Sequence, residues 1–222
     1  MITGKNMMQR AIILLSGGID SAVALWILKS KYDIFALSFK YGDRNRKEMQ
    51  AATRLVEKAD IKNHLIVDLS FLREVSELPE LKNSPILEKL KIPPTYIPSR
   101  NTIFFGIAFH YAEIISAKYI ATGHSFIDPF PDSKPKYVKA VNKALLYGSW
   151  VGKKYKTKII MPLAKLDKAG IVRLAIEEHA PLELTWSCYE DNDVACGRCN
   201  GCRDRLRAFK DINKNDSIEY AL

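Results

Sequence analysis

The chain carries Leu14-Leu15-Ser16-Gly17-Gly18-Ile19-Asp20-Ser21-Ala22 near its N-terminus, and this stretch decides the fold. The apolar run of residues 11–15 is typical of a buried strand, and an apolar helix is expected from about Asp20 onward. The two consecutive glycines let the backbone fold back without a Cβ clash, so several N–H groups can point into one concavity. The N-terminus of the following helix adds free donors and the positive end of its dipole. The stretch therefore predicts a cradle for an anion such as a nucleotide phosphate.

The side chains of this stretch suit the same purpose. Ser16 and Ser21 supply hydroxyl groups, and Asp20 can hold a magnesium ion or cap the helix. The spacing differs from the Walker G-x-x-x-x-G-K-[ST] loop and from the dinucleotide-binding G-x-G-x-x-G loop. Its form, S-G-G-x-D-S, resembles the pyrophosphate loop of the ATP pyrophosphatases, which activate substrates by attack at the α-phosphate of ATP. The alternative is an ordinary turn between a strand and a helix.

Strand-like and helix-like segments alternate along the chain, which is typical of an α/β fold with a parallel sheet. We therefore expect a doubly wound, mainly parallel five-stranded sheet. The expected strands are residues 11–15, 34–39, 64–69, 118–122 and 157–161, and the expected helices are residues 20–30, 44–59, 101–117, 135–146, 168–179 and a short one near 203–210. Ligands of such sheets lie beyond the carboxyl ends of the strands, where residues 16–21, 41–46 and 123–128 fall.

Length and composition indicate one globular domain with a full core. The chain has 222 residues, of which 47% are hydrophobic and 27% charged. Its longest apolar stretch, residues 102–117, is interrupted by His110, Tyr111 and Glu113 and predicts a buried helix rather than a membrane span. The first ten residues lack the apolar core of a secretory signal, so we expect a cytoplasmic enzyme without membrane association.

The net charge of +9 suits an anionic ligand such as ATP, and it is also compatible with nucleic acid. Eight lysines fall within residues 134–158. A solvated face accounts for such a cluster, and no recognised RNA-binding motif accompanies it. We therefore expect no direct binding of RNA.

The cysteines all lie within fifteen residues near the C-terminus, at Cys188, Cys196, Cys199 and Cys202. In a chain without secretory features, this C-x7-C-x2-C-x2-C pattern favours a metal over disulfides. Four thiolates on so short a tether can surround one Zn²⁺, and a zinc with no open position would be structural. It would fasten a segment too short to bury a core alone. Two disulfides and an iron–sulfur cluster are the alternatives.

Two regions interrupt the alternation of strands and helices. Residues 70–99 form a long connection with five prolines, which is typical of a lid or of a packed surface excursion. The cysteine segment begins near Pro181. We expect residues 1–180 to form an ATP pyrophosphatase domain and residues 181–222 to be a zinc-binding extension of that same domain.

Further motifs follow the first loop in a fixed order. They are Tyr41-Gly42-Asp43-Arg44, Ile97-Pro98-Ser99-Arg100-Asn101, Phe130-Pro131-Asp132, Met161-Pro162-Leu163, Leu166-Asp167-Lys168 and Thr185-Trp186-Ser187-Cys188-Tyr189. With the first loop and the four cysteines, these motifs resemble the 7-cyano-7-deazaguanine synthase (QueC) family, a branch of the N-type ATP pyrophosphatases. The resemblance runs from about Arg10 to Leu206 and implies the fold of the adenine nucleotide α-hydrolases.

The resemblance implies an ATP-dependent carbon–nitrogen ligase. This family converts 7-carboxy-7-deazaguanine, ammonia and ATP, with Mg²⁺, to the nitrile used in making the modified tRNA bases queuosine and archaeosine. A carboxylate is a poor acyl donor because its leaving group would be oxide, whereas attack on ATP creates a good leaving group that ammonia can displace. A second activation of the amide then yields the nitrile. The resemblance also implies a homodimer and one structural zinc.

Roles for individual residues follow from the same resemblance. Asp20, Ser16, Lys168 and Arg100 would take part in catalysis, with Lys168 contacting a phosphate or, alternatively, lying in solvent behind an Asp167 cap. Arg100 and Asn101 could grip phosphate or the substrate carboxylate. Tyr41, Arg44 and Asp132 are further candidates on the substrate side, or local structural contacts. The stretch expected to line the ATP site consists of Leu15, Ser16, Gly17, Gly18, Ile19, Asp20, Ser21, Ala22, Val23, Ala24 and Leu25.

Two segments depart from the family pattern and keep other functions open. Where the family commonly has Ser-Gly-Tyr-Pro-Asp-Cys-Arg, this chain has Asp128-Pro129-Phe130-Pro131-Asp132-Ser133-Lys134. The segment from Thr122 to Asp128 looks like the T-G-H-x-x-x-D segment of tRNA-thiolating and lysidine-forming pyrophosphatases, although a lone His124 is more often a hydrogen-bonded loop residue than a catalyst. A tRNA-modifying enzyme is therefore the main alternative. A non-catalytic ATP-binding module is the second.

Overall fold

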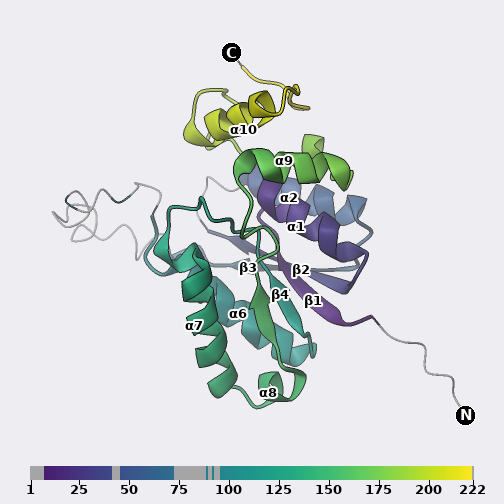
Figure 1. The fold of residues 1–222 in the computed structure, drawn as a ribbon, viewed down its shortest axis with the longest axis vertical. Coiled ribbons are helices and arrows are strands. Elements are labelled where there is room, and N and C mark those ends of the chain that lie inside the picture. The colour runs from purple at the N-terminus through teal and green to yellow at the C-terminus, as the bar shows by residue number, and fades with distance from the viewer. Residues whose placement is uncertain (1–7, 42–45, 73–88, 90–91, 93–95, 222) are drawn as a thin grey trace, which may run out of the picture.

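The computed structural model describes residues 8–41, 46–72, 89, 92 and 96–221 and contains a five-stranded parallel sheet (Figure 1). The strand order is β3-β2-β1-β4-β5. The strands are β1 (Arg10–Leu14), β2 (Asp33–Lys40), β3 (Asn63–Asp68), β4 (Tyr119–Ala121) and β5 (Lys158–Ile160). The expected five-stranded α/β fold is confirmed, with each strand overlapping its predicted range.

Helices cover both faces of the sheet. The larger ones are α1 (Ile19–Lys29), α2 (Arg46–Lys58), α6 (Arg100–Ile114), α7 (Pro135–Tyr147), α9 (Lys168–Glu177) and α10 (Asn200–Asp211). Figure 1 shows α1, α2 and α9 on one side and α6 and α7 on the other. Successive residues of β1 face opposite sides, because side chains alternate across a strand. Ile13 therefore packs with α1 and α9, and Ile12 packs with α6.

Three short helical elements were not expected from the sequence. They are α8 (Val151–Tyr155), a 3-10 turn at Pro131–Ser133 and a second at Leu182–Leu184. Elements of three to five residues contain too few turns for an apolar period to be recognised. Arg44 and most of residues 70–99 lie outside the described residues. The expected lid therefore belongs to a segment that the structure largely does not describe. Among the helices described, each is too short or too polar to cross a bilayer.

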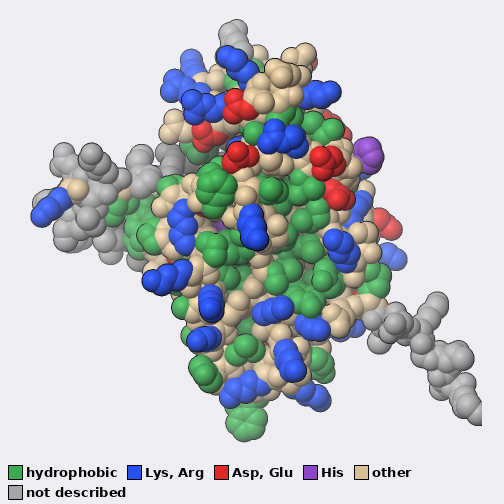
Figure 2. Space-filling view, viewed as in Figure 1, with side chains coloured by type: hydrophobic (Ala, Val, Ile, Leu, Met, Phe, Trp, Pro, Cys, Tyr) green, Lys and Arg blue, Asp and Glu red, His purple; other side chains and the backbone are tan. Residues whose placement is uncertain are grey.

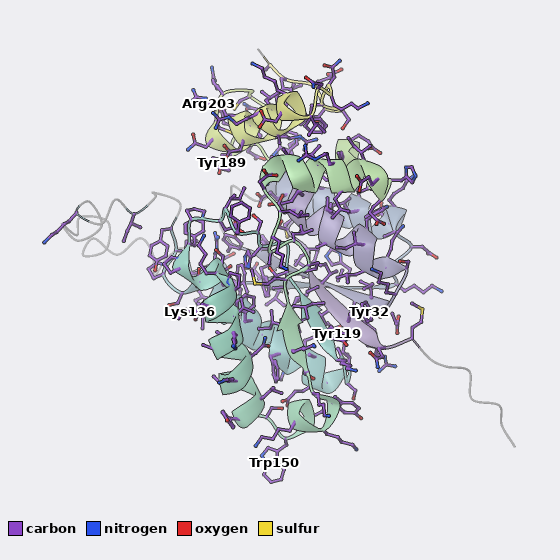
Figure 3. All side chains as sticks on the ribbon, viewed as in Figure 1. Tyr32, Tyr119, Lys136, Trp150, Tyr189 and Arg203 are labelled. Atoms are coloured by element: carbon purple, nitrogen blue, oxygen red, sulfur yellow. The ribbon has the colours of Figure 1, made fainter. Side chains whose placement is uncertain are left out.

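The lysine cluster lies along α7, α8 and β5. Seven of its eight lysines are exposed, whereas Lys134 turns inward and its Nζ donates to the backbone oxygens of Phe126 and Asp128. Figure 2 shows Lys and Arg side chains spread over this half of the visible face, with acidic side chains gathered toward the other end. Figure 3 places Trp150, which is 93% exposed, at the tip of the same half.

One wholly buried arginine joins the C-terminal segment to the rest of the structure. Arg205 on α10 is 0% exposed, and its guanidinium donates to both carboxylate oxygens of Asp216 at 2.6 and 2.9 Å. It also donates to the Leu182 carbonyl oxygen at 3.0 Å and to the Thr185 hydroxyl oxygen at 2.7 Å. A buried guanidinium needs such full pairing, because an uncompensated charge inside a protein is costly.

We expect Asp216→Asn to destabilise the protein by about 3–5 kcal/mol, because it leaves the Arg205 charge buried without its counter-ion. Burial alone would raise the pKa of Asp216, but the hydrogen bonds and charge of Arg205 outweigh it and lower that pKa. The carboxylate's contribution is thus present above the ordinary carboxyl pKa and is lost as pH falls through the lowered one. Urea unfolding at pH 7 and pH 3 measures both effects.

The matched control is Asp193→Asn. Asp193 pairs with Lys47 at 2.6 Å, but its side chain is 97% exposed, so its loss should leave the unfolding midpoint almost unchanged. Equal midpoint shifts in the two variants would contradict a special role for the buried pair.

Candidate functional site

The loop between β1 and α1 turns sharply at Gly17. Its φ of 90° lies in the region that favours glycine. A Cβ at this position would lie 2.1 Å from the backbone oxygen of Glu48, so α2 approaches the loop too closely for any side chain. On the other side, the Trp186 N–H donates to the Gly17 oxygen at 2.9 Å. The loop is therefore held between α2 and the cysteine segment.

Two serines organise the interior of the loop. The Ser21 hydroxyl donates to the Gly18 oxygen at 3.0 Å and accepts from the Ser16 N–H at 3.2 Å. The Ser16 hydroxyl lies 3.1 Å from that of Ser21 and accepts from the Gly18 N–H at 3.3 Å. These contacts fix the turn before any ligand arrives, which is the arrangement a phosphate cradle requires.

The N-terminus of α1 is open to a ligand. Gly18 occupies the N-cap position, and within the described part of the chain no side chain caps this helix. Asp20 lies in the first turn of α1 and not at the N-cap position. The prediction that Asp20 could cap this helix is therefore wrong. The first N–H groups of α1 and the positive end of its dipole thus remain available to an anion.

Asp20 and Lys168 form an ion pair beside the loop. The Lys168 Nζ lies 2.6 and 2.8 Å from the two carboxylate oxygens of Asp20. Lys168 is the first residue of α9, and the Asp167 side chain caps that helix by accepting from the Gly170 N–H at 2.7 Å. Lys168 therefore follows an Asp167 cap, as one alternative expected, but its side chain binds Asp20 at the loop instead of lying in solvent.

Much of the stretch expected to line the ATP site is buried in the core. Leu15, Ile19 and Ala22–Leu25 are each at most 1% exposed and pack in the core with α9. Beyond the start of α1, the helix turns the side chains of Ala22–Leu25 inward. Within this stretch, Ser16, Gly18 and Asp20 remain at least partly exposed.

Arg100 lies at the start of α6, near the carboxyl end of β2. Its Nη1 donates weakly to the Tyr41 hydroxyl at 3.4 Å, and its guanidinium lies 5.5 Å from the Tyr41 ring centre and 5.6 Å from that of Phe130. Its buried Nε has no hydrogen-bond partner among the described residues. The preceding Ser99 has a φ of 54°, a strained conformation of the kind found beside functional groups.

Asn101 and Asp132 are hydrogen-bonded to each other. The Asn101 N–H and its side-chain amide donate to the two oxygens of Asp132 at 3.0 and 2.9 Å. Both residues are buried, at 4% and 8% exposure. Of the two alternatives for Asp132, the structure favours the local contact, in which it joins the 3-10 turn to the first turn of α6. Arg44 lies outside the described residues.

Glu48 is a charged residue of this region that the sequence analysis missed. It lies in the first turn of α2, and its carboxyl is subject to the positive charge of Arg100. Burial raises the pKa of Glu48 to about 7, and the Arg100 charge opposes that rise. The signal in the sequence was its register: Glu48 lies three, four and seven residues before the buried Ala51, Ala52 and Leu55, on the inward face of the helix.

His124 follows β4 and is also half-buried. Its Nδ1 lies 3.0 Å from the Thr122 hydroxyl, and its ring meets Phe105 edge-on. Burial lowers the pKa of His124, with Asp128 acting in the opposite direction. It is therefore a neutral, hydrogen-bonded residue at neutral pH, as expected for a lone histidine in a loop.

The four cysteine sulfurs form one cluster. They all lie within 4.8 Å of one another, and the thiols are free. Backbone N–H groups of Cys196, Cys199 and Cys202 each donate to a cysteine sulfur at 3.3 to 3.4 Å. Burial opposes ionisation, but N–H groups of Arg198 and Cys199 outweigh it and lower the pKa of Cys196 to about 7. The cluster can hold a metal ion.

Comparisons with known proteins agree with this geometry. The family described as "Queuosine biosynthesis protein QueC" matches residues 10–213. A 7-cyano-7-deazaguanine synthase of Acetivibrio thermocellus is 41% identical, over 96% of this chain and 98% of its own length. One from Thermoplasma volcanium is 38% identical, over 97% and 92%. An NMN synthetase of Francisella tularensis shares the fold at a TM-score of 0.54 and 17% identity, covering 96% of this chain and 80% of its own.

We expect Gly17→Ala to destabilise the protein by at least about 2 kcal/mol and to abolish ATP binding, because it combines a positive φ with a backbone clash. Gly106→Ala on α6 is the control, since a Cβ there meets nothing within 4 Å and alanine favours the helix. Thermal unfolding and ATP titration calorimetry test both. Wild-type ATP affinity in Gly17→Ala would show that the loop is not the phosphate site.

Proposed function

Because this chain belongs to the QueC family of queuosine biosynthesis proteins, we propose that it converts 7-carboxy-7-deazaguanine, ammonia and ATP to 7-cyano-7-deazaguanine. The observation that carries the proposal is the serine-organised loop at the uncapped N-terminus of α1. Such a loop binds the phosphates of ATP, and the near full-length relatedness to 7-cyano-7-deazaguanine synthases supports the choice of substrate.

The residues around the loop divide the work of binding and activation. Ser16, Ser21 and the first N–H groups of α1 hold the triphosphate, and Lys168 exchanges its contact with Asp20 for one with phosphate. Asp20 then holds Mg²⁺, an ion that neutralises phosphate charge. Arg100 presents its fork to the substrate carboxylate or to phosphate. The protein thereby aligns the carboxylate with phosphorus and stabilises the charge that develops in the transfer.

We propose that the cysteine cluster holds one structural zinc. A tetrahedron with metal–sulfur bonds of about 2.3 Å has sulfur–sulfur edges of roughly 3.8 Å, close to the 4.0 Å between Cys196 and Cys202. An iron–sulfur cluster ligated through separate irons would spread the sulfurs farther apart. The zinc fastens residues 181–222 as an extension of the domain formed by residues 1–180.

Three further expectations belong to this proposal. The enzyme is a cytoplasmic homodimer, as the family resemblance implies, and it acts on a free small molecule. Of the two alternatives, a tRNA-modifying enzyme is disfavoured by family membership and by the engagement of His124 with Thr122. A non-catalytic ATP-binding module is disfavoured because the loop keeps both Asp20 and Lys168 beside it.

A single reaction tests the function. Purified protein incubated with 7-carboxy-7-deazaguanine, ammonium and Mg-ATP should yield the amide and then the nitrile, identified by mass spectrometry. Omitting any one substrate should stop the reaction. ATP–pyrophosphate exchange that depends on added tRNA, rather than on the carboxy-deazaguanine, would support the tRNA-modifying alternative instead.

Asp20→Asn should lower kcat by roughly 10²-fold or more, because it removes the charge that holds magnesium at the phosphates. The melting temperature should change little, since both members of the Asp20–Lys168 pair are partly exposed. Steady-state kinetics and thermal unfolding measure the two effects. A fully active variant would refute the role of Asp20.

The metal proposal has its own measurement. Elemental analysis should find one zinc per chain, and the four thiols should react with a thiol reagent only after a chelator is added. Chelation should also lower the unfolding temperature, because binding energy of the metal contributes to folding. Iron at this site, or oxidised thiols without metal, would contradict the proposal of a structural zinc.

A further inference from the structure

Glu48 lies in the first turn of α2, beside the loop between β1 and α1. Its backbone oxygen is the atom that excludes a side chain at Gly17, so the first turn of α2 rests against the phosphate loop. Its side chain is half-buried and acts electrostatically on Tyr41, directly after β2, and on Tyr189, in the cysteine segment. Arg100 completes the surrounding charged groups from α6.

The two opposite charges in this region do not pair. Among the described residues, Glu48 receives no hydrogen bond and forms no ion pair, and Arg100 has no carboxylate within ion-pair distance. Both oxygens of this carboxyl are therefore free to accept a proton or a hydrogen bond from a bound molecule. Carboxylates elsewhere around the site are already engaged, since Asp20 is bound by Lys168 and Asp132 by Asn101.

The chemistry of the proposed function requires a base at nitrogen. Ammonia that attacks an acyl phosphate becomes positively charged, and the amide must later lose two protons from nitrogen to become a nitrile. Within the proposed site, the groups assigned to phosphate and carboxylate are cations, hydroxyls and N–H donors. A carboxyl that no cation engages is suited to accept these protons.

We propose that the Glu48 carboxylate is the proton acceptor for the reacting nitrogen. This inference rests on the proposed function and adds to it. In the amide-forming step, the nitrogen lone pair forms the C–N bond, the bond between carbon and the phosphate-bearing oxygen breaks, and its electron pair leaves with that oxygen. One proton passes from nitrogen to Glu48.

The nitrile-forming step uses the same carboxylate twice. When the amide oxygen attacks the α-phosphate of the second ATP, it takes up the adenylyl group and pyrophosphate leaves. Nitrogen thereby becomes positively charged and gives one proton to Glu48, which returns it to solvent. The remaining N–H proton then goes to Glu48 as the C≡N bond forms. The C–O bond breaks and its electron pair leaves on the phosphate oxygen.

Burial supports this role, because it raises the pKa of Glu48 to about 7, near the pH at which a general base is most effective. The acid limb of the kcat–pH profile of the wild type should therefore fall below about pH 7 and should be absent in Glu48→Gln. Arg100 is the charged group that acts on this carboxyl, and the carboxyl in turn acts on Tyr41 and Tyr189. Burial raises the pKa of both phenols above the ordinary tyrosine value, so neither changes protonation in that range.

The test compares Glu48→Gln with Glu57→Gln, an exposed position on the same helix. We expect Glu48→Gln to lower kcat for amide formation by about 10²–10⁴-fold. The variant should still catalyse ATP–pyrophosphate exchange driven by 7-carboxy-7-deazaguanine without ammonium. Its KM for that substrate should equal that of the wild type. Hydroxylamine, which is largely unprotonated at neutral pH, should restore much of the C–N bond formation. Glu57→Gln should resemble the wild type throughout.

Each result bears on the inference separately from the proposed function. A wild type that makes no nitrile refutes the proposed function itself. If the wild type is active, two results for the Glu48→Gln variant refute the role of Glu48 as proton acceptor. One is unimpaired activity, and the other is a raised KM at unchanged kcat. Loss of the exchange reaction in Glu48→Gln also refutes it, because the carboxyl would then be needed for activation of the acid.

The pH dependence of the melting temperature checks whether the Glu48→Gln variant folds normally. A carboxyl whose pKa is raised from 4.5 to about 7 by burial favours the folded state when protonated, and that contribution is lost as pH rises through about 7. Glu48→Gln should therefore melt near the wild-type temperature at pH 5 and above it at pH 8. A lower melting temperature at both pH values would contradict the half-buried, unpaired state from which the role is inferred.

Discussion

The structure depends on the tight turn at Gly17, where three distant segments leave no room for a side chain. The carbonyl of Glu48 lies against its α-carbon, and the Trp186 N–H binds its oxygen. Gly123 makes a similar approach from β4, because a Cβ there would lie 2.8 Å from the Ser21 nitrogen. The start of α1 is thus fixed from several sides, and its free N–H groups can point to one place without reorganisation.

Around this turn, the molecule keeps several polar groups without permanent partners. Among the described residues, the buried Nε of Arg100 and the half-buried carboxyl of Glu48 have no hydrogen-bond partner, and Ser99 adopts a positive φ. The buried Nε and the strained backbone of Ser99 cost stability in the folded state. The rest of the structure offsets that cost through a core on both faces of the sheet and through the complete pairing of Arg205. The contrast between a fully satisfied anchor and an unsatisfied site is typical of proteins that bind charged substrates.

Local sequence patterns predicted the fold well where an element was long and periodic. The strand and helix around the first loop were placed within about a residue, because an apolar run and a glycine pair mark both boundaries. The same reasoning failed for α8, which is only five residues long. Within the stretch expected to line the ATP site, burial came from the tertiary structure, because α1 turns the side chains of Ala22–Leu25 into the core.

The sequence by itself determined the class of fold, the loop between the first strand and helix, the four-cysteine cluster and the family, because these depend on residues close together in the chain. Tertiary structure alone decided that Asp132 binds Asn101, that Lys168 reaches Asp20, and that Glu48 lies unpaired in the field of Arg100. Those contacts depend on strand order and on burial. Both arise from long-range packing, and neither is encoded in the spacing of neighbouring residues.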